Sequence, residues 1–489
     1  MGAAIQPPGY YVKRFISILP ALFAALLLVL SPAMTAYAGI LPETKITIRQ
    51  ENEMGRKFDR MIRTQMGMVG DTYITDYVDK VVQNIVKAKR PMPFRVQSAV
   101  VSNPILNAFA IPGGYIYIFT GLLQEVQSED QLAAVIAHEL AHVSQRHVAS
   151  RIEKQGKVGI LSMAGILAGA FLGMAGGKGS GKAAAAIMAG SQGMATAAML
   201  KYSREDENEA DHVGLNSLVK AGYNPEGMPE TFQIMIKKRW FDSGSQIPTY
   251  ISTHPGLSER ITYLHDRISR MPASFAERKE ETVTLRHIQP IVRAKMSPAD
   301  TALAYFNNLK PAERTAMDYV GMGIAQQRLK DLDGAAASFA KALSMDGSDP
   351  LVAREAGIFQ FKTGNQKEAF KYLQMAVIKN RRDALGLFYL ARLQAEAGQS
   401  ARGAETMRKV LALVPEDSEV HHHLGMILGE SGDEFGGNLH LAYAALYSND
   451  MRKARYHEQG AEAKASTQAQ KDELEKLKKT IQDRSKPDK

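Results

Sequence analysis

The stretch Ser128–His142, with the sequence SEDQLAAVIAHELAH, decides the fold of the first half of the chain. Its first three residues, Ser-Glu-Asp, are typical of a capped helix start. Apolar residues then recur at helical spacing, at Leu132, Val135 and Ile136. The stretch is therefore predicted to be one helix that carries two histidines near its end.

The last five residues of this stretch, from His138 to His142, have the pattern HExxH. Histidines four residues apart lie on one face of a helix, so both imidazoles can reach a single ion. Neutral imidazole nitrogens suit zinc, and a catalytic zinc site needs three protein ligands and one open position for water. Glu139 can reach that water and take its proton as a general base. The motif predicts a hydrolytic centre with one Zn²⁺ per chain.

A third ligand is expected from Ser203–Asp211, which has the sequence SREDENEAD. By itself this stretch is typical of an exposed acidic helix. Downstream of HExxH, however, the pattern SRxxExxAD resembles the HtpX and CAAX prenyl protease family of gluzincin metallopeptidases. The resemblance implies that Glu207 is the third metal ligand and that Asp211, one turn further on, orients a ligand imidazole. Glu205 and Glu209 lie on other faces of the helix and are expected to be solvated.

The stretch Ser252–Pro255, with the sequence STHP, is followed by Arg260 and matches the same family. The resemblance implies that His254 approaches the zinc. Three roles are open for it: it occupies the open position and holds the enzyme idle, it stabilises the tetrahedral oxyanion, or it only caps a loop. Arg260 is then expected to pair with a nearby carboxylate or with the oxyanion.

Residues 94–119 change to strand character. The segments 108–111 and 115–118, separated by Pro112-Gly113-Gly114, predict a small β-hairpin. Its first strand also resembles the family, where the corresponding strand is an edge along which an extended substrate lies. The resemblance assigns that role to Asn107, Ala108, Phe109 and Ala110.

The second half of the chain repeats every 34 residues. Small residues recur at Gly323, Gly357, Ala391 and Gly425. Seven residues after these stand Lys330, Gly364, Gly398 and Gly432, and nineteen after them stand Ala342, Ala376, Val410 and Ala444. This period, with small residues where helices cross, is the tetratricopeptide signature. We therefore expect an α-solenoid whose groove can bind peptides.

The N-terminal 38 residues predict export. Lys13-Arg14 precedes the uncharged segment 15–30, and Ala36-Tyr37-Ala38 is typical of a signal peptidase site with cleavage before Gly39. An uncleaved membrane anchor is the alternative. The chain has no cysteine, which excludes disulfides, thiolate zinc sites and cysteine catalysis. The net charge of +9 is spread without a basic and aromatic cluster, so no nucleic-acid partner is expected.

Three further segments are open to interpretation. Residues 157–199 are rich in Gly, Ala and Met. They predict either a lid or hairpin in peripheral contact with a membrane, or two packed helices with a flexible link. His147 is expected to point away from the metal, and no second metal site is expected at His421–His423.

The predicted organisation is mainly α-helical. It comprises a signal peptide at 1–38, an α+β zinc metallopeptidase domain with a small sheet at 39–290, a tetratricopeptide domain at 296–460, and a charged tail at 461–489 that is either helical or disordered. This combination resembles the bacterial barrel-assembly-enhancing proteases. The resemblance implies a periplasmic endopeptidase of a Gram-negative bacterium, with possible chaperone-like assistance in assembly. It would hydrolyse misfolded or stalled outer-membrane proteins and contact the barrel-assembly machinery through its repeats.

Two rival hypotheses come from the same sequence. One is a non-proteolytic scaffold or chaperone for outer-membrane protein assembly, which binds clients through the repeats. The other is a membrane-embedded protease of the prenyl protease type, which would need several membrane spans, whereas only the N-terminal segment has that composition.

Overall fold

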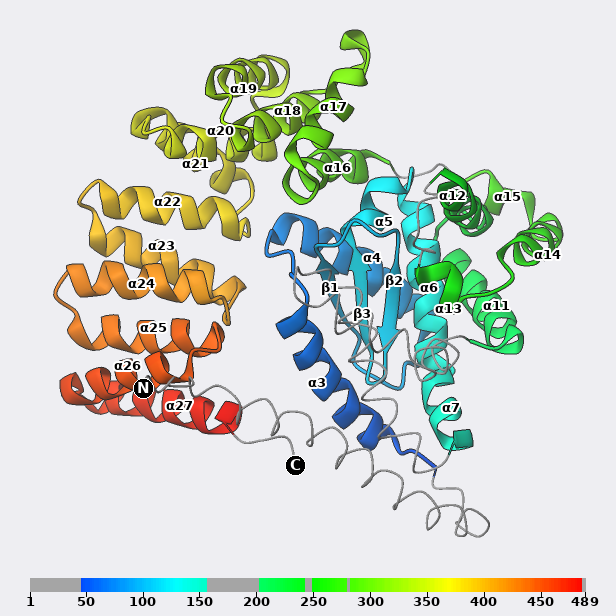
Figure 1. Ribbon diagram of the computed structural model, residues 1–489, viewed down its shortest axis with the longest axis horizontal. Coiled ribbons are helices and arrows are strands. Elements are labelled where there is room, and N and C mark those ends of the chain that lie inside the picture. Colours follow the sequence, from blue (N-terminus) through cyan, green and yellow to red (C-terminus); the bar gives the residue numbers. More distant parts are fainter. Residues whose placement is uncertain (1–44, 156–201, 242–248, 279–281, 486–489) are drawn as a thin grey trace, which may run out of the picture.

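The computed structural model describes residues 45–155, 202–241, 249–278 and 282–485 (Figure 1). The predicted signal segment 1–38 and the Gly-rich segment 157–199 lie outside the described residues. Among the helices that are described, none has both the length and the apolar character needed to cross a membrane.

A three-stranded sheet lies at the centre of the first half of the chain, in the order β1-β3-β2. Strands β2 (Ala108–Ile111) and β3 (Tyr115–Phe119) are antiparallel, which confirms the predicted hairpin. Gly113 and Gly114 turn the chain between them at φ of +84° and +89°, values that suit glycine. Strand β1 (Gln97–Val101) runs parallel to β3 on its other side. Among the described residues, strand β2 therefore pairs with one other strand and is an edge of the sheet.

The two faces of β3 are buried against different helices. Ile116 and Ile118 pack in the core that contains α4 (Thr72–Lys89) and α6 (Glu129–Ser144). Tyr117 and its neighbours on the opposite face pack with α3 (Ile48–Gln65). The short helix α5 (Thr120–Glu125) links β3 to α6, and α7 (His147–Gln155) follows α6.

A second group of helices packs on α6 from the side away from the sheet. Both α11 (Arg204–Lys220) and α12 (Gly227–Phe241) contact α6, and α14 (Leu257–Ser269) contacts α12. Two short helices complete the group, α13 (Thr249–Thr253) and α15 (Ala273–Ala276). Together they surround the HExxH segment.

The rest of the chain is a stack of antiparallel helix pairs, which confirms the predicted helical-repeat architecture. Two helices and one short 3₁₀ turn lead into it: α16 (Val283–Met296), α17 (Ala299–Asn308) and η1 (Pro311–Glu313). The stack then consists of α18 (Ala316–Arg328), α19 (Leu332–Asp346), α20 (Pro350–Lys362), α21 (Gln366–Lys379), α22 (Ala384–Glu396), α23 (Ser400–Leu413), α24 (Ser418–Glu430), α25 (Glu434–Tyr447), α26 (Met451–Lys464) and α27 (Gln468–Ser485). In Figure 1 the stack forms an arc whose inner side faces α3 and the sheet.

The repeated small residues have the expected packing role. A Cβ atom on Gly357 of α20 would lie 2.9 Å from Leu373 Cγ of α21, so only glycine allows the two helices to approach so closely. The turn positions seven residues later adopt left-handed backbone, including Lys330 at φ +69°. At the end of the stack, Leu474, Leu477 and Ile481 of α27 are buried against α25 and α26.

A buried charge cluster joins the stack to the first half of the chain. Arg354 of α20 is 0% exposed, and its two Nη atoms lie 2.9 and 2.7 Å from the carboxylate oxygens of Asp71, the N-cap of α4. Glu355 and Asp383 also contact Arg354, and Lys295 of α16 bridges Glu355 and Asp71. Burial alone would raise the pKa of Asp71, but the charges of Arg354 and Lys295 lower it to about 2. At neutral pH Asp71 is therefore ionised. We call the group of Arg354, Asp71, Glu355, Asp383 and Lys295 the Arg354 clamp.

Replacing Arg354→Met should destabilise the protein by roughly 3–5 kcal/mol, because three buried carboxylates would lose their central cation. The free energy of unfolding in urea at pH 7 measures this loss. Arg402→Met on the exposed surface of α23 is the matched control and should change stability by less than about 0.5 kcal/mol. Equal stabilities of the two variants would contradict a structural role for the clamp.

Candidate metal centre

Helix α6 presents His138, Glu139 and His142 from a fully buried segment. Its start is fixed as predicted, because the Ser128 side chain accepts a hydrogen bond from Gln131 N, which marks Ser128 as the N-cap. The apolar side of α6 packs in the core with α4 and the sheet. The motif is thus carried by one rigid helix.

Helix α11 presents Glu207 from its first turn. A capping box between Ser203 and Asp206 begins the helix. Gly214 then sits against the backbone of α6, where an added Cβ would lie 3.2 Å from Ala137 carbonyl atoms and from His138 Cα. This close crossing brings a carboxylate that is about 65 residues away in the sequence to the two imidazoles.

Four side chains converge on one point: His138, His142, Glu207 and His254. One donor atom from each lies within 4.8 Å of the other three. His138 Nε2 lies 3.1 Å from His142 Nε2 and 3.3 Å from His254 Nδ1. Glu207 lies 2.9 Å from His254 Nδ1, 3.5 Å from His138 Nε2 and 3.6 Å from His142 Nε2. The structure therefore brings together all four metal ligands proposed from the sequence.

This donor set fits a tetrahedral zinc ion. With bonds of about 2.0–2.1 Å, the edges of such a tetrahedron are roughly 3.3 Å, close to the separations between these nitrogen and oxygen atoms. Two imidazoles and one carboxylate are also a known donor set for catalytic zinc. Glu139 adds a second sign of fit, because its buried Oε1 has no hydrogen-bond partner among the described residues and lies 3.6 Å from His254 Nε2.

Asp211 and Arg260 surround the donors with a second layer of contacts. His138 Nδ1 lies 2.9 Å from Asp211 Oδ1, which leaves Nε2 free to face the other donors. Arg260 donates to both oxygens of Asp211, at 2.7 and 2.6 Å, and also donates to Glu207 Oε2. Of the two alternatives for Arg260, the contact with a carboxylate is the one present here.

Sequence reasoning missed the contacts on the other side of His142. His147 lies 2.8 Å from it, between the two Nδ1 atoms, and its own Nε2 is 3.3 Å from Glu209 Oε2. His147 therefore lies behind the metal-facing nitrogen, where it orients His142. Glu209 is half-exposed but contacts His147 as well as solvent. The aromatic ring of Tyr202 stacks on His142 with 3.7 Å between ring centroids.

The two imidazoles of the HExxH motif have opposite pKa shifts. Burial would lower the pKa of His138, but hydrogen bonds to Asp211 and Glu207 raise it to about 9. Burial by itself would raise the pKa of Glu207, but His254 and His138 lower it, so its carboxylate stays ionised. Burial and the charge of His138 lower the pKa of His142, which keeps it in the neutral form that binds metals. The pKa of Glu139 is raised, mainly by burial.

The predicted substrate strand lies beside this centre. Ala110 and Ile111 of β2 line a small pocket together with His142 and Tyr202. Asn107 precedes the strand and is buried with Ala108, while Phe109 and Ala110 are half-buried. Phe109 stacks on Tyr117 of β3.

The histidines of the repeats do not form a comparable group. Within the described ranges, the four side chains above are the one cluster with metal-ligand spacing. His421 is buried and pairs with His440 of α25 at 3.0 Å. His422 is exposed on the same helix, so these consecutive histidines face different surroundings.

An HExxH helix completed by a glutamate from a second helix defines the His₂Glu class of metallopeptidase centre. Residues 71–268 match the model of Peptidase family M48. The match contains all the residues of the centre. It confirms the metallopeptidase resemblance inferred from the motifs.

Several curated proteins are similar to the chain. The beta-barrel assembly-enhancing protease of Yersinia pestis is 26% identical over 389 residues, which cover 76% of each chain. That of Escherichia coli is 27% identical over 257 residues, covering 51% of this chain and 52% of that one. The human mitochondrial metalloendopeptidase OMA1 is 33% identical over 171 residues, covering 35% and 31%. The chain spans about half the length of the first curated relatives that it matches.

Solved repeat proteins are also similar in structure. The tetratricopeptide protein YrrB is 19% identical, with a TM-score of 0.29, and the match covers 36% of this chain and 91% of that one. A TM-score this low does not support a fold assignment. The repeat architecture described above is shown by the helix pairs of this chain.

Replacing Asp211→Asn should weaken zinc binding about 10- to 100-fold, because the carboxylate that orients His138 is lost. Competition with a chromogenic chelator measures the affinity, and circular dichroism checks the fold. Glu205→Gln, on an exposed face of the same helix, is the control and should bind zinc as the parent does. An unchanged affinity in Asp211→Asn would exclude this orienting role.

Proposed function

We propose that this chain is a zinc-dependent endopeptidase that hydrolyses unfolded or misassembled proteins. The observation that carries the proposal is the convergence of His138, His142 and Glu207 on one point, with Glu139 beside it. The M48 match and the names of the relatives support the same chemistry. The proposed metal ligands are the first three residues, with His254 as a fourth.

The chain supplies positioning and proton transfer. A zinc ion held by these ligands would polarise the scissile carbonyl and lower the pKa of its bound water. Glu139 takes the proton from the attacking water and delivers it to the leaving amine, a double role that its burial and raised pKa favour. Asp211 and Arg260 hold His138 and Glu207 in place. Strand β2 is an edge of the sheet among the described residues, and an extended peptide can pair with such an edge as a further strand.

His254 is proposed to hold the centre in a resting state. Its Nδ1 lies among the other donor atoms, so with zinc bound it would complete a closed tetrahedron. Catalysis requires an open fourth position, which means that His254 must move away when substrate arrives. Tyr250 stacks on the His254 ring at 4.2 Å between centroids and supports the resting position.

The clients are proposed to be outer-membrane proteins, and the compartment the periplasm. The beta-barrel assembly-enhancing proteases among the relatives support this, together with the export signal expected in residues 1–38. The arc of repeats is the proposed contact surface for clients and for the barrel-assembly machinery. Chaperone-like assistance by the repeats is compatible with this role.

Replacing Glu139→Gln should reduce hydrolysis of fluorescently labelled, unfolded casein about 10²- to 10⁴-fold, because the general base is lost while the metal ligands remain. Zinc content, measured by mass spectrometry of the purified protein, should stay near one per chain. In Glu207→Gln the zinc content itself should fall, since one ligand has lost its charge. Glu205→Gln is the control for both measurements.

These variants also decide between the enzyme and the non-proteolytic scaffold. Casein hydrolysis that survives in Glu139→Gln would show that this centre does not perform it. A parent protein that carries no zinc and cleaves nothing would leave the scaffold as the better description of the chain.

Replacing His254→Ala should increase casein hydrolysis several-fold, because the fourth position would be open without displacement of a side chain. Initial rates on zinc-loaded protein measure the change. His265→Ala, on the exposed side of α14, is the control and should leave the rate as it is. An unchanged or lost activity in His254→Ala would remove the resting-state model and leave an oxyanion-stabilising or structural role.

A further inference from the structure

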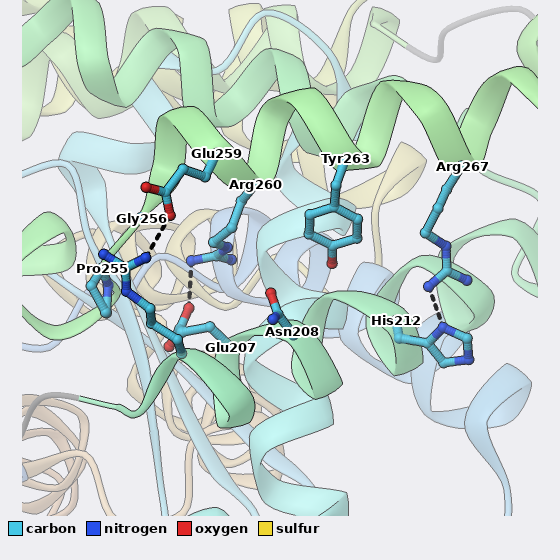
Figure 2. A pocket seen from close by; sticks show the side chains of 10 residues that line it. Glu207, Asn208, His212, Pro255, Gly256, Glu259, Arg260, Tyr263 and Arg267 are labelled. Atoms are coloured by element: carbon cyan, nitrogen blue, oxygen red, sulfur yellow. Dashed lines mark hydrogen bonds and ion pairs between the residues drawn. The ribbon is translucent and has the colours of Figure 1, made fainter.

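A pocket of about 560 Å³, lined mainly by polar and charged residues, lies between α11 and α14, next to the metal centre (Figure 2). Glu207 and Arg260 line one part of it, so the pocket is continuous with the centre. In Figure 2 its side chains follow α14 from Glu259 to Arg267, and face α11 as far as His212. The pocket therefore leads away from the metal along two parallel walls.

Three arginines line this pocket, and two of them have acidic partners. Arg204 Nη1 lies 2.9 Å from Glu259 Oε2, and both side chains are mostly exposed. Arg260 is buried, and it contacts Glu207 and Asp211. The charges of these two arginines are thus already balanced within the site.

The positive charge of Arg267 is not balanced in this way by an acidic side chain in the described part of the chain. Its Nη1 donates a hydrogen bond to His212 Nδ1, and no carboxylate in the described part of the chain pairs with it. Because His212 accepts this hydrogen bond, it is neutral and carries its proton on Nε2. The lowered pKa of His212, caused by partial burial and by Arg267, agrees with the neutral form. The far end of the pocket therefore holds one unbalanced cation and a neutral donor.

Tyr263 adds a second donor between Arg260 and Arg267. Its hydroxyl is buried, and burial together with the charge and the hydrogen bond of the Asp211 carboxylate raises its pKa, so the hydroxyl keeps its proton. Asp211 also contacts Arg260 and His138. A ligand oxygen in the pocket can therefore accept a hydrogen bond from Tyr263 while Asp211 keeps its other two partners. In Figure 2 this hydroxyl points toward α11, between Asn208 and His212.

The distance between Arg260 and Arg267 indicates how far the Arg267 end of the pocket lies from the peptide bond that is hydrolysed. Arg260 and Arg267 are seven residues apart on α14, two helical turns or about 10 Å. An extended peptide advances about 3.3 Å per residue. A group that reaches Arg267 would therefore lie about three residues from a peptide bond held at the metal.

We propose that this pocket binds a carboxylate of the substrate peptide, with Arg267 as the cation and with His212 and Tyr263 as donors. This inference rests on the proposed peptidase function and adds to it a preference for acidic peptides. The carboxylate comes either from an acidic side chain or from the C-terminus of the peptide. Charge-assisted hydrogen bonds from a guanidinium suit both sources.

Peptide binding to zinc-loaded Glu139→Gln protein tests the proposal without requiring cleavage. Three fluorescent peptides share one unfolded sequence: the first has internal Glu residues and an amidated end, the second has Gln in their place and a free C-terminus, and the third has Gln and an amidated end. Fluorescence anisotropy gives each dissociation constant. We expect at least one of the first two to bind about tenfold more tightly than the third, and this identifies the source of the carboxylate.

Adding Arg267→Gln to this protein should remove the preference, whereas Arg267→Lys should retain part of it because the charge remains. Arg270→Gln is the matched control, since Arg270 lies on the same helix, is exposed, and pairs with Asp266 outside the pocket. Equal affinities for all three peptides, or a preference that survives Arg267→Gln, would overturn the proposal. Neither result would affect the proposed peptidase function, which is tested separately by casein hydrolysis and by its loss in Glu139→Gln.

Discussion

The close crossing of α6 and α11 is the constraint on which the metal centre depends. Gly214 lies against the backbone at Ala137 and His138, where an added Cβ would lie only 3.2 Å from backbone atoms of α6, so a larger residue would require the two helices to shift. At this separation Glu207 reaches both imidazoles, and Asp211, four residues later on the same face, reaches the outer nitrogen of His138. One glycine thus sets the positions of a donor and of the group that orients another donor.

The burial of this centre makes its charges interdependent. An ionised carboxylate without a partner is costly in such an environment, and each carboxylate here contacts a histidine or Arg260. The result is a compact network that is largely closed to solvent. The charges in the pocket between α11 and α14 are arranged differently. There Arg267 and His212 border solvent and pair with each other instead of with a carboxylate.

Local patterns in the sequence predicted the parts of the fold that depend on local contacts. The HExxH helix, the hairpin around Pro112–Gly114 and the 34-residue period each depend on contacts between residues that are close in the chain or in register. The position of Glu207 came from a resemblance, because no local pattern shows which carboxylate reaches the histidines. The roles of His147 and Arg267 depend on packing between separate helices, and spacing alone contains no signal for them.

The Arg354 clamp illustrates the same limit at longer range, since Arg354 and Asp71 are 283 residues apart in the chain. It also has a consequence for assembly. Asp71 caps α4, a helix that packs directly on the sheet, but Arg354 belongs to the second repeat pair. During synthesis, Asp71 therefore lacks its buried bidentate partner until α20 has been made, and Lys295 of α16 is the earlier of its two cations. In a fragment that stops short of α20, the surface around Asp71 would face water.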